Sequence, residues 1–145
     1  MFDELEKYKH TGHFFFKPVD NLTMKCNAPT DEGGVYLVYA LSKGNIELVY
    51  VGSSGQKQVD GTLKIRKAGL GGIKDRIVNG HQFGKNPRRK SWPVQMLKEK
   101  IEALDIYWWI THEGKLKDFP EEVEHDLLQK FYDRFGRLPR WNKEI

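Results

Sequence analysis

The sequence predicts an α+β fold in which a small three-stranded antiparallel sheet is flanked by helices. Residues 33–52 hold two runs rich in Val, Leu and Tyr on either side of a polar group, which indicates a β-hairpin. Residues 106–111 are aromatic and β-branched and indicate a third strand, and apolar residues recur at helical spacing in residues 120–136. With helical patterns after the hairpin, the order is hairpin, helix, helix, strand, helix, which is typical of this fold class.

Length and composition favour one folded domain without a membrane segment. The chain has 145 residues, of which 39% are hydrophobic and 12% aromatic, as in globular proteins. No apolar run approaches the roughly 20 residues of a membrane span, and the first residues lack the pattern of a signal peptide. Cys26 is the only cysteine, which excludes an internal disulfide and a multi-cysteine zinc site. We therefore expect a cytoplasmic protein.

The net charge of +4 is unevenly distributed. Residues 57–90 hold ten basic residues against two acids, whereas residues 99–126 hold nine acids. A basic stretch of this kind is expected of a protein that binds the phosphate backbone of nucleic acid, although a solvated loop also fits. The candidate nucleic-acid contacts are Lys64, Arg66, Lys67, Lys74, Lys85, Arg88, Arg89 and Lys90.

The first 32 residues are predicted to form an N-terminal extension packed on the domain of residues 33–145. Residues 2–9 fit a short amphipathic helix, and residues 13–16 fit a strand or packing segment. Residues 18–33 are expected to be a loop, because Pro and Gly interrupt them.

In the hairpin, Gly44 and Asn45 are expected to take the positive φ angles of the turn. The first strand is apolar on both faces, so we expect it to be a central strand that is covered on both sides.

After the hairpin, residues 53–72 are expected to form a long basic loop, which is an uncommon and often functional feature. A helix is predicted from Ile73 to about Gly80, followed by a second basic loop over residues 81–90. The next helix is expected to start at Pro93 and to present one apolar face of Val94, Leu97 and Ile101.

The last predicted helix starts at Pro120 and is closed by Gly136. At about 100° per residue it has one apolar arc, which consists of Val123, Leu127, Leu128, Phe131 and Phe135. Glu124 falls near the middle of this arc, Glu121 at its edge, and Glu122 points away. A carboxylate facing a core is costly unless a cation or several donors meet it, so Glu124 is a candidate for metal binding or catalysis; a salt-bridged Glu at the rim of the sheet is the alternative.

Two short tags in the hairpin, Gly34-Val35-Tyr36 and Tyr50-Val51-Gly52, resemble the paired motif of the GIY-YIG nucleases, with Val in place of Ile in both. The resemblance extends over residues 33–142. Arg76 stands where this family has an arginine on the first helix after the hairpin, and Glu124 where it has a glutamate on the last helix, ahead of a stretch that here ends in Asn142.

The resemblance implies a metal-dependent endonuclease that hydrolyses phosphodiester bonds of DNA. It implies that Tyr36 is the general base, that Tyr50 orients water or phosphate, that Arg76 holds the phosphate, and that Glu124 binds one Mg²⁺ or Mn²⁺. Gly34, Gly52 and Asn142 would support the site. Many members carry His or Tyr at the position of Gly80, so His81 is the candidate here for proton handling.

Two other classes of function remain open. A nucleic-acid-binding module could keep the scaffold without cutting, and an interaction domain could use the basic loop to contact an acidic protein. The catalytic resemblance covers nearly the whole chain and leaves too few residues for a second DNA-reading domain. We therefore expect a monomer that nicks DNA with little sequence preference, or one that favours branched or single-stranded regions. Site-specific cutting of both strands would need a homodimer or a separate DNA-reading partner.

Overall fold

A computed structural model of the chain describes residues 1–144 and has an α+β fold built on a four-stranded antiparallel sheet. The strands lie in the order β1-β6-β2-β3. In chain order the elements are η1 (Asp3–Lys7), β1 (Thr11–Phe16), α1 (Leu22–Lys25), β2 (Gly34–Ser42), β3 (Asn45–Ser54), β4 (Gln56–Lys57), β5 (Leu63–Lys64), α2 (Gly72–Asn79), α3 (Arg88–Glu99), β6 (Ala103–Ile110), β7 (His112–Glu113), β8 (Leu116–Lys117) and α4 (Pro120–Phe135).

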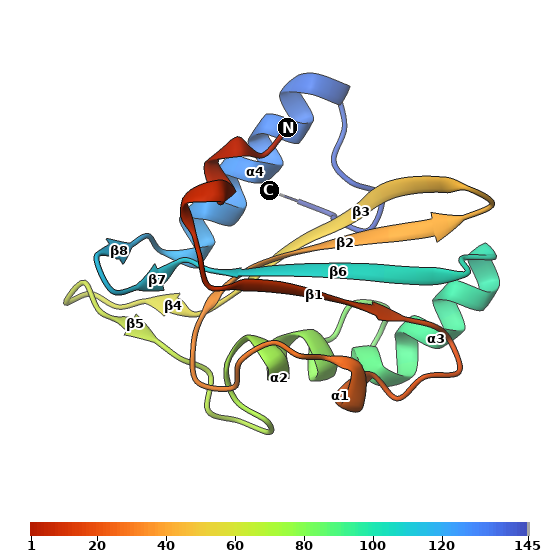
Figure 1. Cartoon of the computed structure of the whole chain (residues 1–145), viewed down its shortest axis with the longest axis horizontal. Helices are drawn as coiled ribbons and strands as arrows, with labels where there is room; N and C mark the ends of the chain where they lie inside the picture. The colour runs from red at the N-terminus through yellow and green to blue at the C-terminus, as the bar shows by residue number, and fades with distance from the viewer. Residues whose placement is uncertain (145) are drawn as a thin grey trace.

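Helices cover both faces of the sheet (Figure 1). On one face, α1, α2 and α3 pack on a core that includes Phe16, Trp92 and Ile106. On the other face, η1 and α4 pack on Val35, Leu37 and Val51. As predicted, β2 is a central strand between β6 and β3, and its residues from Val35 to Val38 are buried.

The prediction of three strands was wrong by one, because the N-terminal segment adds β1 along the free side of β6. Its side chains alternate, so that Phe14 and Phe16 enter the core while His13 and Phe15 point outward. The pairing satisfies backbone groups on that side of β6, and the alternation buries two aromatic rings. The segment predicted as a helix at residues 2–9 is the 3₁₀ helix η1.

The hairpin turn differs from the prediction in one residue. Ser42 pairs with Asn45, so the two turn residues are Lys43 and Gly44, which have φ angles of 48° and 79°. Asn45 already belongs to β3. The backbone N–H of Lys43 donates to the carboxylate of Glu102 at 2.7 Å, which helps to hold this lysine in the left-handed conformation.

Two predicted loops contain regular structure. Asn21 caps the short helix α1 by accepting a hydrogen bond from the N–H of Met24, so residues 18–33 are not entirely loop. Residues 53–72 contain the two-stranded β4–β5 hairpin, which projects beside α2 (Figure 1).

Helix α3 begins at Arg88, not at Pro93, and buries a different face from the one predicted. Trp92 and Met96 are fully buried, whereas Val94 and Leu97 are 67% and 68% exposed. The larger Trp92 side chain sets the rotation of the helix, and Ile101 is buried only after the helix has ended at Glu99. Helix α2, strand β6 and helix α4 lie close to their predicted positions.

Within residues 1–144, no helix is long and apolar enough to cross a lipid bilayer.

Candidate functional site

The predicted site residues gather around β3, the edge strand of the sheet. The C-terminal segment runs along the open side of this strand: the N–H of Trp141 donates to the carbonyl of Val49 at 2.8 Å. The side chain of Asn142 then replaces a strand backbone. Its Oδ1 accepts from the N–H of Val51 and its Nδ2 donates to the carbonyl of Val51, both at 2.9 Å. Asn142 thus fixes the residue between Tyr50 and Gly52.

Close packing explains why both tags contain glycine. Gly52 lies opposite Tyr36 in the β2–β3 ladder, and a Cβ on Gly52 would lie 2.4 Å from Cζ and 2.6 Å from the hydroxyl of Tyr36. A Cβ on Gly34 would lie 1.9 Å from the carbonyl oxygen of Trp109 on β6. Neither position has room for a side chain: Gly34 is needed for β2 to pair with β6, and Gly52 is needed to accommodate the rings of Tyr36 and Tyr50.

The two tyrosines form a pair on the face of the sheet that α2 and α3 cover. Their ring centroids are 6.0 Å apart. Tyr36 is fully buried, and its hydroxyl has no hydrogen-bond partner among the described residues. Tyr50 is half-buried; burial raises the pKa of its phenol well above the usual range, and the cations Arg88 and Arg76 oppose that rise. An unpartnered buried hydroxyl costs stability, so Tyr36 is not explained by packing alone.

Arg88 was predicted to contact nucleic acid, but it is only 1% exposed and lies inside the protein. Its Nη1 donates to the carbonyl of Arg76 at 2.7 Å, and its Nε donates to Gln82 at 3.0 Å. The guanidinium also lies over the rings of Tyr36 and Tyr50, 5.5 and 5.1 Å from their centroids. The prediction was wrong because a run of basic residues does not show which of them the fold buries.

Glu124 reaches the same region from α4 and is half-buried. Burial raises the pKa of its carboxyl group, while a hydrogen bond with Ser53 and the charge of Arg76 oppose the rise. The predicted apolar arc of α4 is correct for Leu127, Leu128 and Phe131, which are buried, but wrong for Phe135, which is 48% exposed in the last turn.

A cleft of about 990 Å³ opens beside these residues, between the β4–β5 hairpin and α2. Four cations and one acid, Glu121, are among its lining residues, and the cations are Lys64, Arg66, Lys67 and Arg76. Lys64 and Lys67 are exposed, whereas Arg66 forms an ion pair with the buried carboxylate of Asp75. The cleft is therefore suited to an anionic ligand. Arg76 lines it, and the carbonyl of Arg76 accepts a hydrogen bond from Arg88, which lies over both tyrosines.

The other predicted contacts do not line this cleft. Arg89 is exposed, donates to Asn79 at 2.9 Å and lines a separate hollow with Asn21. His81 is exposed and forms an isolated β-bridge with Pro87. The remaining predicted basic residues outside the cleft are Lys74, which is half-buried, and Lys85 and Lys90, which are exposed.

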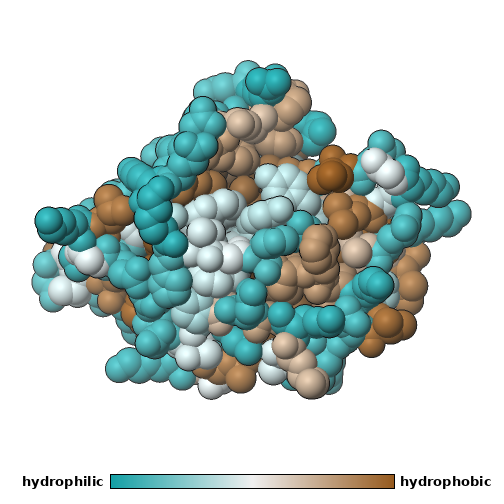
Figure 2. Space-filling model, viewed as in Figure 1, coloured by the Kyte–Doolittle hydropathy of each residue, from teal (hydrophilic) through white to brown (hydrophobic). Residues whose placement is uncertain are grey.

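A second groove, of about 610 Å³, lies on the opposite face of the sheet beside α4. Its lining is largely apolar and includes Leu37, Tyr107, Trp109 and Phe131. On the face seen in Figure 2, pale and brown side chains gather over the sheet below α4, with hydrophilic side chains around them. None of the predicted site residues lines this groove.

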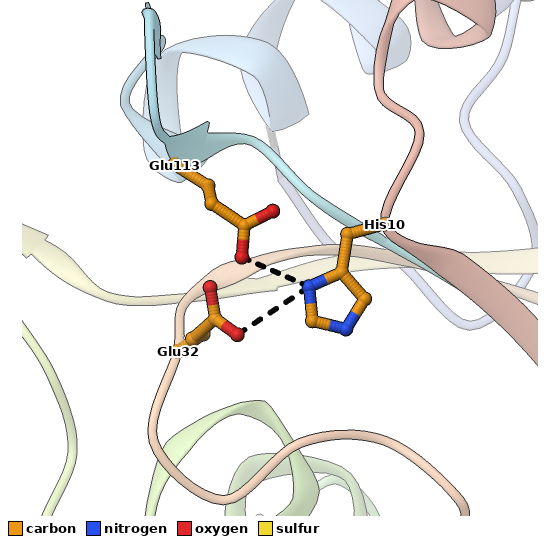
Figure 3. Close-up of side chains that lie close together, drawn as sticks. All are labelled: His10, Glu32 and Glu113. Atoms are coloured by element: carbon orange, nitrogen blue, oxygen red, sulfur yellow. Dashed lines mark hydrogen bonds and ion pairs between the residues drawn. The ribbon is translucent and has the colours of Figure 1, made fainter.

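Three segments that are distant in the chain bring together His10, Glu32 and Glu113, a cluster that no local sequence pattern indicates (Figure 3). Nδ1 of His10 lies 3.0 Å from Glu113 and 3.4 Å from Glu32. Their potential ligand atoms lie within 4.8 Å of one another, a spacing that a cation could bridge. Burial and the neighbouring Glu113 raise the pKa of Glu32 to about 7. The cluster ties the entry to β1, the entry to β2 and β7 together.

Comparison of the chain with protein-family models, curated proteins and solved structures found no match.

Proposed function

We propose that this protein is a metal-dependent endonuclease of the GIY-YIG type, which hydrolyses phosphodiester bonds in DNA. The observation that carries the proposal is the convergence of Tyr36, Tyr50, Arg76 and Glu124 from four different elements, with Arg76 also lining the cation-rich cleft. The rings of the two tyrosines lie 6.0 Å apart, and the charges of Arg76 and Glu124 both act on the Tyr50 phenol.

In this proposal the cleft binds the sugar–phosphate backbone and Arg76 holds the scissile phosphate with its planar fork of donors. Tyr36, as phenolate, accepts a proton from water while the water oxygen forms a bond to phosphorus. The bond from phosphorus to the leaving sugar oxygen breaks, and that oxygen takes up a proton from solvent. Tyr50 orients the water or the phosphate.

Glu124 fits the metal-binding role because it is a half-buried carboxylate and the charge of Arg76, a residue that lines the cleft, acts on it. Mg²⁺ and Mn²⁺ prefer oxygen ligands, and one carboxylate together with water and phosphate is a usual set for Mg²⁺. When bound, the ion would stabilise negative charge on the leaving oxygen.

The burial of Tyr36 favours a second candidate function, a nucleic-acid-binding module that does not cut. A general base must come within hydrogen-bond reach of the proton that it takes, and Tyr36 is fully buried in the protein alone. The nuclease therefore needs a movement that admits water to Tyr36 when DNA binds, whereas the binding module does not.

A cleavage assay separates the two candidates. Plasmid and branched DNA would be incubated with Mg²⁺, with Mn²⁺ or with a chelator. The nuclease should nick in the presence of metal only, and Glu124→Gln should abolish cutting while leaving DNA binding and the melting temperature close to the parent values. Glu122→Gln is the matched control, because Glu122 is exposed on the same helix and pairs with Lys57. Binding without any cutting by the parent protein would select the binding module.

We also propose that the enzyme acts as a monomer in the cytoplasm and nicks one strand at a time. The buried thiol of Cys26, whose pKa burial raises to about 11, is compatible with a reducing compartment. Site-specific cutting of both strands would require a homodimer or a separate DNA-reading partner. Sedimentation on DNA, together with mapping of the cut ends, tests this part of the proposal.

A further inference from the structure

Arg88 is a buried cation whose presence packing does not explain. Within residues 1–144, no carboxylate forms a salt bridge with it. A buried charge without an ionic partner is costly, and an apolar side chain of similar size could fill the same space at lower cost. A guanidinium at this position therefore points to a role that an apolar residue could not perform.

The contacts of Arg88 connect the parts of the proposed site. Through Nη1 it donates to the carbonyl of Arg76, in the last turn of α2, and its guanidinium lies over the rings of Tyr36 and Tyr50. Gly80 leaves the necessary space, since a Cβ there would lie 2.4 Å from Nη1. One side chain thus contacts both tyrosines and the backbone of Arg76, the arginine proposed to hold the phosphate.

Gln82 and Trp92 fix the orientation of the Arg88 side chain. Gln82 accepts a hydrogen bond from Nε of Arg88 at 3.0 Å and another from Nε1 of Trp92 at 3.0 Å. Trp92 is fully buried and lies 5.5 Å from the guanidinium. The guanidinium of Arg88 is therefore held between the buried Trp92 on one side and the tyrosine pair on the other. This arrangement is expected of a side chain that positions neighbouring residues of a site.

We propose that Arg88 is a positioning residue of this site, which sets the tyrosine pair and the C-terminal end of α2 in a fixed relation to each other. This inference rests on the proposed nuclease function. It assigns Arg88 no contact with DNA, because its side chain is inside the protein. A displacement of reacting groups by about 1 Å can lower the rate about 100-fold. Loss of the planar donors of Arg88 should therefore lower the rate of the chemical step and leave the affinity for DNA unchanged.

The test is Arg88→Lys, which keeps the charge and loses the planar fork. With saturating DNA and Mg²⁺, well below the melting temperature, we expect the single-turnover rate to fall about tenfold or more, while the DNA dissociation constant measured with a chelator changes by less than about twofold. Arg134→Lys, an exposed arginine on α4, should change neither quantity. An unchanged rate, or weaker binding at an unchanged saturating rate, overturns the inference.

A readout that needs no DNA separates failure of this inference from failure of the nuclease proposal. The protein has six tyrosines, and fluorotyrosine labelling with Tyr36→Phe and Tyr50→Phe assigns two of the resonances in fluorine NMR. Arg88→Lys should shift these two resonances and leave the other four in place. If Arg88→Lys does not fold, Gln82→Ala retains Arg88 but removes the acceptor that orients it, and the same two resonances should shift. If neither variant moves them, Arg88 is not a positioning residue, whatever the parent protein does to DNA.

Discussion

Replacing Asn142 with alanine should loosen the edge of the sheet at the centre of the second tag. The substitution removes two side-chain hydrogen bonds of 2.9 Å and leaves the N–H and the carbonyl of Val51 without those partners. A typical hydrogen bond contributes about 1 kcal/mol net, and an orphaned buried group costs about 1–3 kcal/mol. Because Asn142 is itself only half-buried, water can reach part of the gap, so we expect a loss of about 2 kcal/mol in the free energy of unfolding.

For a domain of this size, a loss of that magnitude corresponds to a fall of about 4–8 °C in melting temperature. Urea unfolding followed by the fluorescence of the four tryptophans measures the free energy, and hydrogen exchange at the amide of Val51 reports the local effect. Lys143→Ala, at the exposed neighbouring position, is the control. A loss below about 0.5 kcal/mol with unchanged exchange at Val51 would mean that the two hydrogen bonds do not hold the strand.

Three further predictions concern the proposed site and the cluster of His10, Glu32 and Glu113. Tyr36→Phe should leave the free energy of unfolding unchanged or slightly higher, because the hydroxyl has no partner, yet it should abolish cleavage. Lys64→Ala together with Lys67→Ala should weaken DNA binding for all sequences alike and reduce the slope of log affinity against log salt by about 2. Burial and the carboxylate of Glu113 raise the Glu32 pKa from 4.5 to about 7, so the folded state binds this proton more tightly than the unfolded state does. The resulting stabilisation is present at low pH and is lost as the pH rises through 7. Glu32→Gln should therefore reduce the loss of stability between about pH 5 and pH 8.

Each of these predictions has a distinct contrary outcome. If the Tyr36→Phe variant cuts at the parent rate, Tyr36 is not the general base. A large loss of stability in this variant would show that the Tyr36 hydroxyl has a hydrogen-bond partner. The lysine pair is contradicted by an unchanged salt slope, with alanine at Lys115 and Lys117, exposed and outside the cleft, as control. The same pH dependence in the Glu32 variant as in the parent, measured by urea midpoints, would assign that dependence to other groups.

Local patterns predicted those elements whose signals lie within one segment. The β2–β3 hairpin, α2 and α4 are set by short-range alternation, helical period and turn residues, and all three lie close to where the sequence placed them. Residues 13–16 were expected to form a strand or packing segment, but the place of β1 in the sheet was not predicted, and the start of α3 was misplaced. Both depend on partners elsewhere, the free side of β6 and the core around Trp92. For the same reason Arg88 and Arg89 are indistinguishable in sequence, although the fold buries the first and exposes the second. The His10 cluster joins segments about 100 residues apart, which no local pattern reports.

The residues of the two tags separate into those that packing explains and those that it does not. Gly34 has no room for a Cβ against the backbone of β6, so the strand pairing itself requires it, whereas Gly52 is required by the rings of Tyr36 and Tyr50. Tyr36 and Arg88 behave differently: a phenylalanine would avoid the unpartnered hydroxyl, and an apolar residue would avoid the unpaired charge. The Arg88 guanidinium lies 5.5 Å from the centroid of the Tyr36 ring. Two destabilising groups so close together are not explained by stability alone. Substitutions at these two positions therefore discriminate between a working nuclease and an inert scaffold more sharply than substitutions in the glycines by which the resemblance is first seen.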